Sequence, residues 1–261
     1  MRPALSWPSS EHSNPEESMV DEAFYLQLQS FLLADSPCAV EWASAADAEG
    51  FYNICLLAYW PSKALYDKWT LDSGFRTWWE SIDSDTQSHG WFLEVVCCPM
   101  DRFENIFSHA EPSQGAATMR THVSGPVKEH HYWGSMRDRL PAGQTDELRA
   151  EKTAAGPSKA SGVPGQQNVA MIRSGQDWSE ALAEERQIYF ATMQPVLKAG
   201  MDFLRHQGDE VGCISCRFMD VIDPATLRAD RDRTFGLAYF EDVASLEGWS
   251  KKHPTHKAIC V

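Results

Sequence analysis

The chain has 261 residues, of which 43% are hydrophobic and 23% charged, and its formal net charge is −14 at pH 7. This is the composition of an ordinary globular protein that can bury a sizeable core. The acidic balance argues against nucleic acid and anionic membrane surfaces as partners, because both select for clustered Lys and Arg.

No apolar run near the start resembles a signal sequence, and none reaches the roughly 20 residues that span a bilayer. We therefore expect a soluble, cytoplasmic protein without membrane contact. The seven cysteines lie mostly in apolar runs that predict strands, which indicates buried, reduced thiols. Cys213 and Cys216 have the spacing of redox and zinc motifs, but there is no second such pair, and strand alternation predicts side chains on opposite faces.

The first half of the chain is predicted to alternate helices and strands. Residues 1–15 are rich in Pro, Ser and Glu, which predicts disorder. Hydrophobic spacing and chain breaks then predict a helix over 16–34, a strand over 53–60, a helix that starts at Ser62, an aromatic turn over 75–79 and a strand over 90–98.

A stretch of small and polar residues over 141–167 predicts a linker or loop between two units, at 16–140 and 168–261. The second unit is predicted to contain a strand over 168–172, a helix over 177–205, strands over 212–221 and 234–240, a helix over 245–252 and the start of a strand over 257–261. The resulting order, β-α-β-β-α-β, is that of the ferredoxin-like fold.

The two units share a short motif. Tyr59 precedes Trp69 by ten residues, as Tyr239 precedes Trp249, and an alanine comes directly before each tyrosine. With the matching element order, this favours an internal duplication. The predicted fold class is α+β, with two fused ferredoxin-like units of the dimeric α+β barrel type around a shared site. The first unit lacks an opening strand and the last strand stops at Val261, so we expect the pair to be truncated at both ends.

Three polar motifs could carry chemistry, and each has a structural alternative. His253 and His256 flank Pro254 at a predicted helix end, where they are either surface imidazoles or metal ligands. Ser174 lies at a predicted strand-to-helix junction, where it either caps the helix or binds a small polar ligand beside freed amides. Residues 129–139 mix acidic, imidazole, aromatic and guanidinium groups, which indicates either a functional site or a loop with internal ion pairs.

The motifs EHHYWGSMRDRLP, NVAMIRSGQDW, GMDFLR and HPTH occur in this order. From about residue 50 to the end, the chain resembles the haem-containing aldoxime dehydratases of the phenylacetaldoxime dehydratase type. The resemblance implies two fused ferredoxin-like units and a non-covalent haem b. It also implies that an aldoxime, R-CH=N-OH, binds ferrous iron through nitrogen and becomes a nitrile and water. Family members are often dimers, so a homodimer is compatible with the resemblance.

By the same resemblance, His256 in HPTH is the proximal iron ligand. Ser174 in RSGQDW corresponds to the distal serine that hydrogen-bonds the oxime hydroxyl, and Arg139 in MRDR corresponds to the distal arginine. Glu104 corresponds to an acidic residue that supports the distal network. His130 in EHHYWG is expected to be structural.

The chemistry explains why such residues are needed. Hydroxide is a poor leaving group, so the site must protonate the oxime oxygen while iron polarises the C=N–O unit. Ser174 and Arg139 can orient that oxygen, but neither is a proton donor near neutral pH. The family's acid is a histidine beyond HPTH, which this sequence does not include, so we expect at most weak haem binding and negligible nitrile formation. The alternative is a remnant that binds haem or another apolar ligand without turnover.

Overall fold

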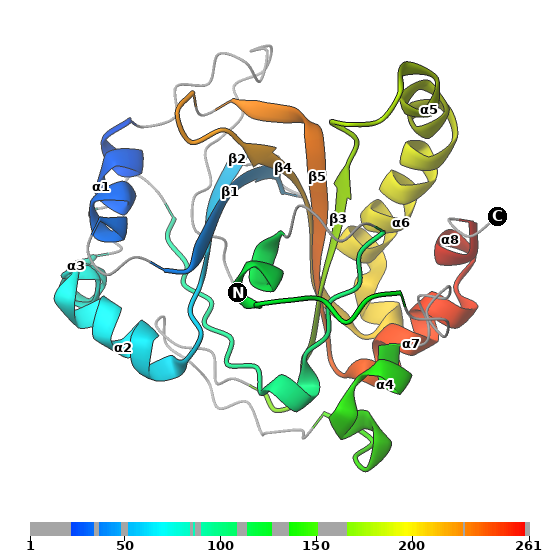
Figure 1. Cartoon of the computed structure of the whole chain (residues 1–261), viewed down its shortest axis with the longest axis horizontal. Helices are drawn as coiled ribbons and strands as arrows, with labels where there is room; N and C mark the ends of the chain where they lie inside the picture. Colours follow the sequence, from blue (N-terminus) through cyan, green and yellow to red (C-terminus); the bar gives the residue numbers. More distant parts are fainter. Residues whose placement is uncertain are drawn as a thin grey trace.

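A five-stranded antiparallel sheet joins the two halves of the chain, with strand order β2-β1-β4-β5-β3 (Figure 1). The computed structural model describes residues 22–33, 37–47, 52–83, 86, 90–108, 114–126, 136–150, 166–226 and 228–258. The strands are β1 (Ala39–Ala46), β2 (Tyr52–Tyr59), β3 (Ala170–Asp177), β4 (Cys213–Ile222) and β5 (Ala229–Phe240). The predicted α+β class is confirmed.

Helices gather at both ends of this sheet. Near β1 and β2 lie α1 (Glu22–Leu32), α2 (Lys63–Asp72) and α3 (Phe75–Ser81). Beside β3 and β5 lie α5 (Ala183–Ile188), α6 (Gln194–Gln207), α7 (Val243–Lys252) and α8 (Pro254–Lys257), with α4 (Met136–Arg139) next to α7 (Figure 1). Short turns complete the described chain: η2 (Met100–Arg102), η3 (Gly115–Met119), η6 (Pro141–Gln144), η7 (Tyr189–Met193) and η8 (Gly208–Val211).

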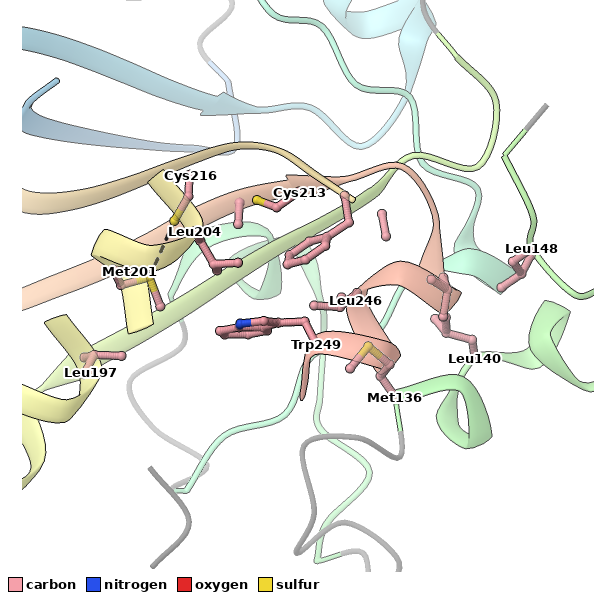
Figure 2. Packing of buried hydrophobic residues seen from close by; sticks show 14 of the residues in the cluster. Met136, Leu140, Leu148, Leu197, Met201, Leu204, Cys213, Cys216, Leu246 and Trp249 are labelled. Atoms are coloured by element: carbon pink, nitrogen blue, oxygen red, sulfur yellow. Dashed lines mark hydrogen bonds between the residues drawn. The ribbon is translucent and has the colours of Figure 1, made fainter. Parts of the chain in front are cut away.

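The helices α6 and α7 pack on one face of the sheet, which we call the helix-covered face. Met201 and Leu204 of α6 meet Cys216 of β4, and Leu246 and Trp249 of α7 pack in the same buried cluster (Figure 2). Each of these side chains is at most 7% exposed. Burial of this apolar surface fixes the helices on the sheet, since each fully buried large side chain contributes about 1.5–3 kcal/mol.

Among the described residues, the opposite face of the sheet is covered by an extended segment that contains Phe92 and Glu94, and by the 3-10 helix η3, whose Gly115 lies beside Tyr59 and Arg173. Glu94 accepts hydrogen bonds from Arg217 at 2.8 Å and from the hydroxyl of Tyr239 at 3.0 Å. Phe92 lies under the same guanidinium, 5.0 Å from it. The strand predicted over 90–98 is therefore wrong, because this segment is held by alternate side chains and forms no backbone ladder with the described strands.

The two cysteines of the Cys-x-x-Cys motif share a face, contrary to the prediction. The register of β4 against β5 shifts between Cys213 and Ser215, which marks a β-bulge. The extra residue resets the alternation, so Cys213 and Cys216 both lie in the helix-covered cluster. Both thiols are free, and Cys216 Sγ lies 3.6 Å from Met201 Sδ. The prediction that most cysteines are buried is also wrong, because Cys38, Cys97 and Cys98 are exposed.

The helix predicted over 177–205 starts later and is interrupted. It begins at Ala183, because β3 continues to Asp177 and Trp178 follows it in irregular chain. The turn η7 is π-helical and directly precedes α6, whose first turn contains Pro195. Proline has no N–H to give to the carbonyl of Ala191, so the wider turn is placed where a regular α-helical bond cannot form.

Three further predictions differ from the structure. The aromatic turn over 75–79 is part of the helix α3, and Lys257 ends the helix α8 instead of starting a strand. Residues 259–261 and 151–165 lie outside the described residues. The described start of the predicted linker is folded, because Leu148 is only 3% exposed.

Candidate functional site

Ser174 lies in the middle of β3, opposite Gly236 of β5, and does not cap a helix. The N-cap residue of α5 is Leu182. Strand alternation puts Ser174 on the same face as Ala170 and Ile172, which belong to the helix-covered cluster. The hydroxyl therefore lies on the helix-covered face and is partly exposed.

Arg139 and Glu104 form an ion pair, although 35 residues separate them. The Nε and Nη2 groups of Arg139 donate to the two carboxylate oxygens of Glu104, with 2.7 Å between Nη2 and Oε1. Only 9% of the Arg139 side chain is exposed. Two parallel bonds to one carboxylate fix the plane of the guanidinium, so Glu104 sets the direction in which Arg139 presents its positive charge.

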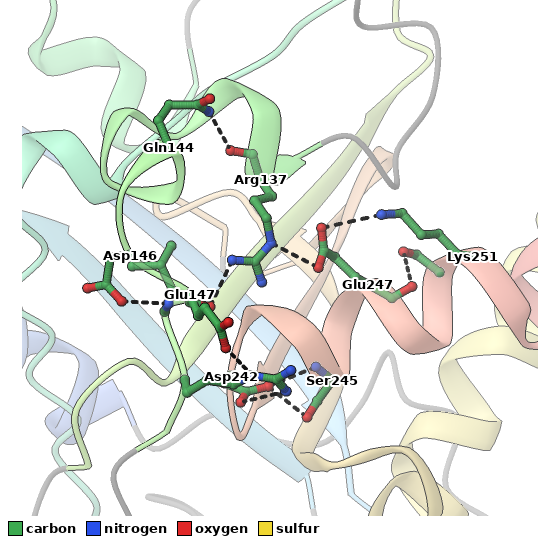
Figure 3. Close-up of polar contacts among 11 residues, drawn as sticks. Arg137, Gln144, Asp146, Glu147, Asp242, Ser245, Glu247 and Lys251 are labelled. Carbon is green, nitrogen blue, oxygen red and sulfur yellow. Dashed lines mark hydrogen bonds and ion pairs between the residues drawn. The ribbon is translucent and has the colours of Figure 1, made fainter.

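A second arginine holds α4 in place. Arg137 Nε pairs with Glu247 of α7 at 3.1 Å, and its Nη1 donates to the carbonyl of Glu147 at 2.8 Å (Figure 3). Lys251 also reaches Glu247, at 3.4 Å. Since Arg137 and Arg139 belong to the same short helix, these contacts tie the Arg139 backbone to α7.

His256 is a buried imidazole in α8, with 8% of the residue exposed. Its ring meets that of Trp249 edge-on, with 4.6 Å between centroids. Burial lowers the pKa of His256, and a hydrogen bond to the backbone of Ser250 raises it in part, with a net lowering. The imidazole is therefore neutral near pH 7, the form in which histidine ligates metals.

Two buried nitrogens, on rings that contact each other edge-on, lack partners among the described residues. These are Nδ1 of His256 and Nε1 of Trp249. A buried polar atom without a hydrogen bond costs free energy, so such atoms mark places where a bound group completes the structure. The backbone of Ser250 also interacts with the imidazole, and metal-ligating histidines commonly have such a contact with a backbone carbonyl.

His253 caps the helix that carries His256. It is the N-cap residue of α8, and its Nδ1 accepts from the backbone N–H of Thr255 at 3.4 Å and lies 2.8 Å from the Thr255 hydroxyl. The ring of Phe203 stacks on His253 at 4.0 Å. The motif His-Pro-Thr-His thus builds a new short helix after α7 and fixes its start.

The elements that carry Arg139, Ser174 and His256 converge on one cluster. Met136 and Leu140 flank Arg139, and both pack with Trp249 in the helix-covered cluster. Ile172 of β3 packs against the same cluster, two residues before Ser174. Figure 2 shows Met136 and Leu140 below α7, with Trp249 between them and α6. The three side chains therefore belong to one side of the sheet.

No group of three or more His, Cys, Asp or Glu side chains in the described ranges is arranged to hold a metal ion. A bare ion would find too few protein ligands there. One neutral imidazole, whose Nδ1 has no partner in the described part of the chain, fits a metal that a macrocycle already coordinates and that needs a single protein ligand.

Sequence reasoning missed two further residues, Gln176 and Thr234. They lie opposite each other in the β3–β5 ladder, and their side chains are hydrogen-bonded at 3.0 Å. Extending the strand through RSGQ would have put Gln176 on the face of Ser174 by alternation. His130 lies outside the described residues.

Comparison with known proteins gives a consistent result. The sequence matches the haem-containing dehydratase family over residues 9–261. The chain is 36% identical over 235 residues to an aliphatic aldoxime dehydratase of Rhodococcus erythropolis, which covers 88% of this chain and 66% of the relative. It is 30% identical over 243 residues to a phenylacetaldoxime dehydratase of Bacillus sp. (strain OxB-1), with 88% and 67% covered. The chain thus spans about two thirds of the length of these relatives.

Solved structures agree with the sequence relatives. A crystal structure of an aldoxime dehydratase matches with a TM-score of 0.78 at 32% identity, over 92% of this chain and 69% of that one. A second aldoxime dehydratase structure, a complex with butyraldoxime, matches with a TM-score of 0.78 over 92% of this chain and 68% of its own. Within the described residues, no helix is both long and apolar enough to cross a membrane.

Proposed function

The chain belongs to the haem-containing dehydratase family, and we propose that it is a haem-dependent aldoxime dehydratase, which converts an aldoxime to a nitrile and water. The family predicted from the four sequence motifs is the one that the whole-chain match identifies. This activity is that of longer relatives. For this chain, it is supported by four side chains on and beside the helix-covered face: His256, Ser174, Arg139 and Glu104.

The observation that carries the proposal is the buried, unpartnered Nδ1 of His256. We assign this imidazole as the side chain that would bind the iron of a haem b. Burial lowers the pKa of His256, so its imidazole is neutral near pH 7, and the ring packs edge-on against Trp249. When bound, the ferrous haem supplies an electron-pair acceptor that polarises the C=N–OH unit of the substrate through its nitrogen.

Ser174 and Arg139 act on the oxygen of the oxime. The hydroxyl of Ser174 donates a hydrogen bond to this oxygen, which orients the leaving group. The Arg139 guanidinium places a fixed positive charge where negative charge develops as the N–O bond breaks. Glu104 does not touch the substrate in this scheme; it holds the Arg139 fork in one plane through two hydrogen bonds.

The sheet supports a further proposal, that the fold consists of two fused ferredoxin-like units. The order β4-β5-β3 is the ferredoxin-like order for the first three strands of the second unit. The β1–β2 hairpin of the first unit and the β4–β5 hairpin of the second also have matching registers. Leu57 lies opposite Glu41 in β1–β2, and Leu237 lies opposite Arg217 in β4–β5, with a tyrosine two residues after each leucine.

The test is a haem titration of the purified protein, followed by aldoxime under reducing conditions. A Soret band at one haem per chain, with nitrile formation from butyraldoxime or phenylacetaldoxime, would support the proposal and would overturn the expectation of weak haem binding and negligible turnover that follows from the missing acid. His256→Ala should lose the spectrum of histidine-ligated haem, while Ser174→Ala should keep that spectrum and lower kcat to a value that can still be measured. The exposed variant Thr118→Val is the matched control, because it removes a hydroxyl whose only described bond is local, to the carbonyl of Gly115.

Two results separate the alternatives. An unchanged Soret spectrum in His256→Ala would remove the ligand assignment. Stoichiometric haem binding without nitrile formation from either aldoxime would instead favour a haem-binding protein without turnover.

A further inference from the structure

Gln176 is positioned to orient the hydroxyl of Ser174. The two residues lie on the same face of β3, and Gln176 Nε2 donates to the carbonyl oxygen of Ser174 at 3.1 Å and to its Oγ at 3.5 Å. On its other side, Gln176 Oε1 accepts from the hydroxyl of Thr234 at 3.0 Å. Thr234 is buried, with 6% of the residue exposed.

These contacts fix which end of the amide faces Ser174. A carbonyl oxygen is only an acceptor, so the Ser174 carbonyl selects the NH2 end of Gln176. A flipped amide would bring two oxygens together at this position. The Thr234 hydroxyl can donate to the oxygen that remains, so both ends of Gln176 are used at once.

The orientation of Gln176 decides what the Ser174 hydroxyl can do. A serine hydroxyl has one proton to donate and lone pairs that accept. Since Gln176 supplies a donor to Oγ, the Ser174 proton is not directed at this neighbour and can point to another acceptor. Accepting a hydrogen bond also polarises the O–H group and strengthens the bond that it donates.

We propose that Gln176 is a positioning residue for dehydration, which holds Ser174 as a hydrogen-bond donor toward the oxime oxygen, and that Thr234 holds Gln176 in the required orientation. The inference rests on the proposed function, because it assigns the acceptor to the oxime. It adds a relay of side chains, Thr234 to Gln176 to Ser174, that crosses from β5 to β3.

The purely structural alternative is that Gln176 and Thr234 only join two strands. The two roles differ in a double-mutant cycle. If Gln176 acts through Ser174, Gln176→Leu should lower kcat by about 3- to 10-fold, the range expected for one lost hydrogen bond. In a Ser174→Ala background, the same change should then have almost no further effect. If the role is structural, the two losses multiply.

Conservative substitutions of Gln176 and Thr234 distinguish the two roles further. Gln176→Glu keeps the shape but replaces the donor by an acceptor, which draws the Ser174 proton to itself, so its loss of kcat should exceed that of Gln176→Leu. Thr234→Val keeps the shape and removes the hydroxyl, and should lower kcat by about 2- to 5-fold. Thr234→Ser restores a hydroxyl and should recover most of that loss.

The experiment uses the haem-loaded full chain under reducing conditions with butyraldoxime. For each variant, kcat and KM are measured together with the Soret-monitored affinity for the aldoxime and the melting temperature. We expect kcat to change more than KM, and the haem spectrum without substrate to stay that of the wild type. Multiplicative losses in the Ser174→Ala background, or equal kcat in Thr234→Val and wild type, would overturn the inference.

A failure of the inference is distinguishable from a failure of the proposed function. If Ser174→Ala itself leaves kcat unchanged, the role of Ser174 is wrong. If Ser174→Ala lowers kcat while Gln176→Leu does not, only the relay is wrong. Should Gln176→Leu unfold, the Thr234 pair decides between the same two outcomes.

Discussion

Replacing Asp242 should lower the free energy of unfolding, because this carboxylate caps the start of α7 and also binds the backbone of Ala150, 92 residues earlier in the chain. Its Oδ1 accepts from the backbone N–H and the hydroxyl of Ser245 at 2.8 and 2.9 Å (Figure 3). Its Oδ2 accepts from the N–H of Ala150 at 3.3 Å. Arg149 approaches to 4.0 Å, but 64% of its side chain is exposed, so it adds little.

The magnitude follows from the bonds that are lost. Removing an N-cap carboxylate costs about 1 kcal/mol, and leaving the half-buried N–H of Ala150 without a partner adds up to about 1–3 kcal/mol. For Asp242→Ala, we expect the free energy of unfolding to fall by about 2–4 kcal/mol. Asp242→Asn retains an oxygen that can cap α7, but its NH2 group would face the N–H of Ala150. The free energy of unfolding should therefore fall by less than in Asp242→Ala.

The effect should depend on pH with a defined sign. Burial alone would raise the pKa of Asp242, but the hydrogen bonds from Ser245 and Ala150 outweigh it and hold the pKa below its ordinary value. A carboxyl whose pKa is lower in the folded state stabilises the fold above its unfolded pKa of about 3.9. This contribution is lost as the pH falls through the folded pKa.

The assay is urea unfolding at neutral and acidic pH, with the exposed variant Asp209→Ala as a control for loss of an aspartate. The difference in the free energy of unfolding between wild type and Asp242→Asn should become smaller as the pH falls. A loss below about 0.5 kcal/mol for Asp242→Ala, which is within the range of ordinary surface changes, would refute the capping argument.

Three further outcomes are expected. Met219 is fully buried, so Met219→Ala should lower the free energy of unfolding, measured with urea, by about 2–5 kcal/mol; a smaller decrease would mean that the sheet closes the cavity. Cys213 and Cys216 should resist thiol reagents at pH 8 until the protein unfolds, because burial raises their pKa values to about 11 and about 12; rapid native-state labelling of either thiol would contradict this. His253→Ala should weaken haem binding by about 2- to 10-fold and His253→Asn should restore it, since asparagine also caps helices; equal haem titrations for both variants would exclude the capping role.

Local signals predicted the elements whose ends are fixed by nearby residues. Ser62 caps α2 and accepts from the N–H of Leu65 at 3.3 Å, as its position before an apolar helix suggested. The strands β2, β4 and β5 and the helix α7 also appear where hydrophobic patterns predict them. In contrast, β1 was missed, because its sequence AVEWASAA is rich in alanine, which has a low strand propensity.

Long-range pairing explains what the sequence could not predict. The segment RSGQ contains Gly and polar residues, yet it remains a strand because β5 pairs with it residue by residue. The bulge that brings Cys213 and Cys216 to one face depends on how β4 meets β5. The Arg139–Glu104 pair has no spacing pattern. Arg139 lies in the motif over 129–139, Glu104 was suggested only by the family resemblance, and only the structure brings the two together.

The five strands do not hold together equally along the sheet. Between β1 and β4, only Ala43 with Val221 and Ser44 with Asp220 are paired, whereas β3 and β5 are paired along the full length of β3. Cooperative local opening separates strands that share few backbone hydrogen bonds, such as β1 and β4, because this breaks the fewest bonds. The β1–β2 hairpin is therefore able to exchange its amide protons as a unit, while the strands that carry Ser174 and its relay stay closed.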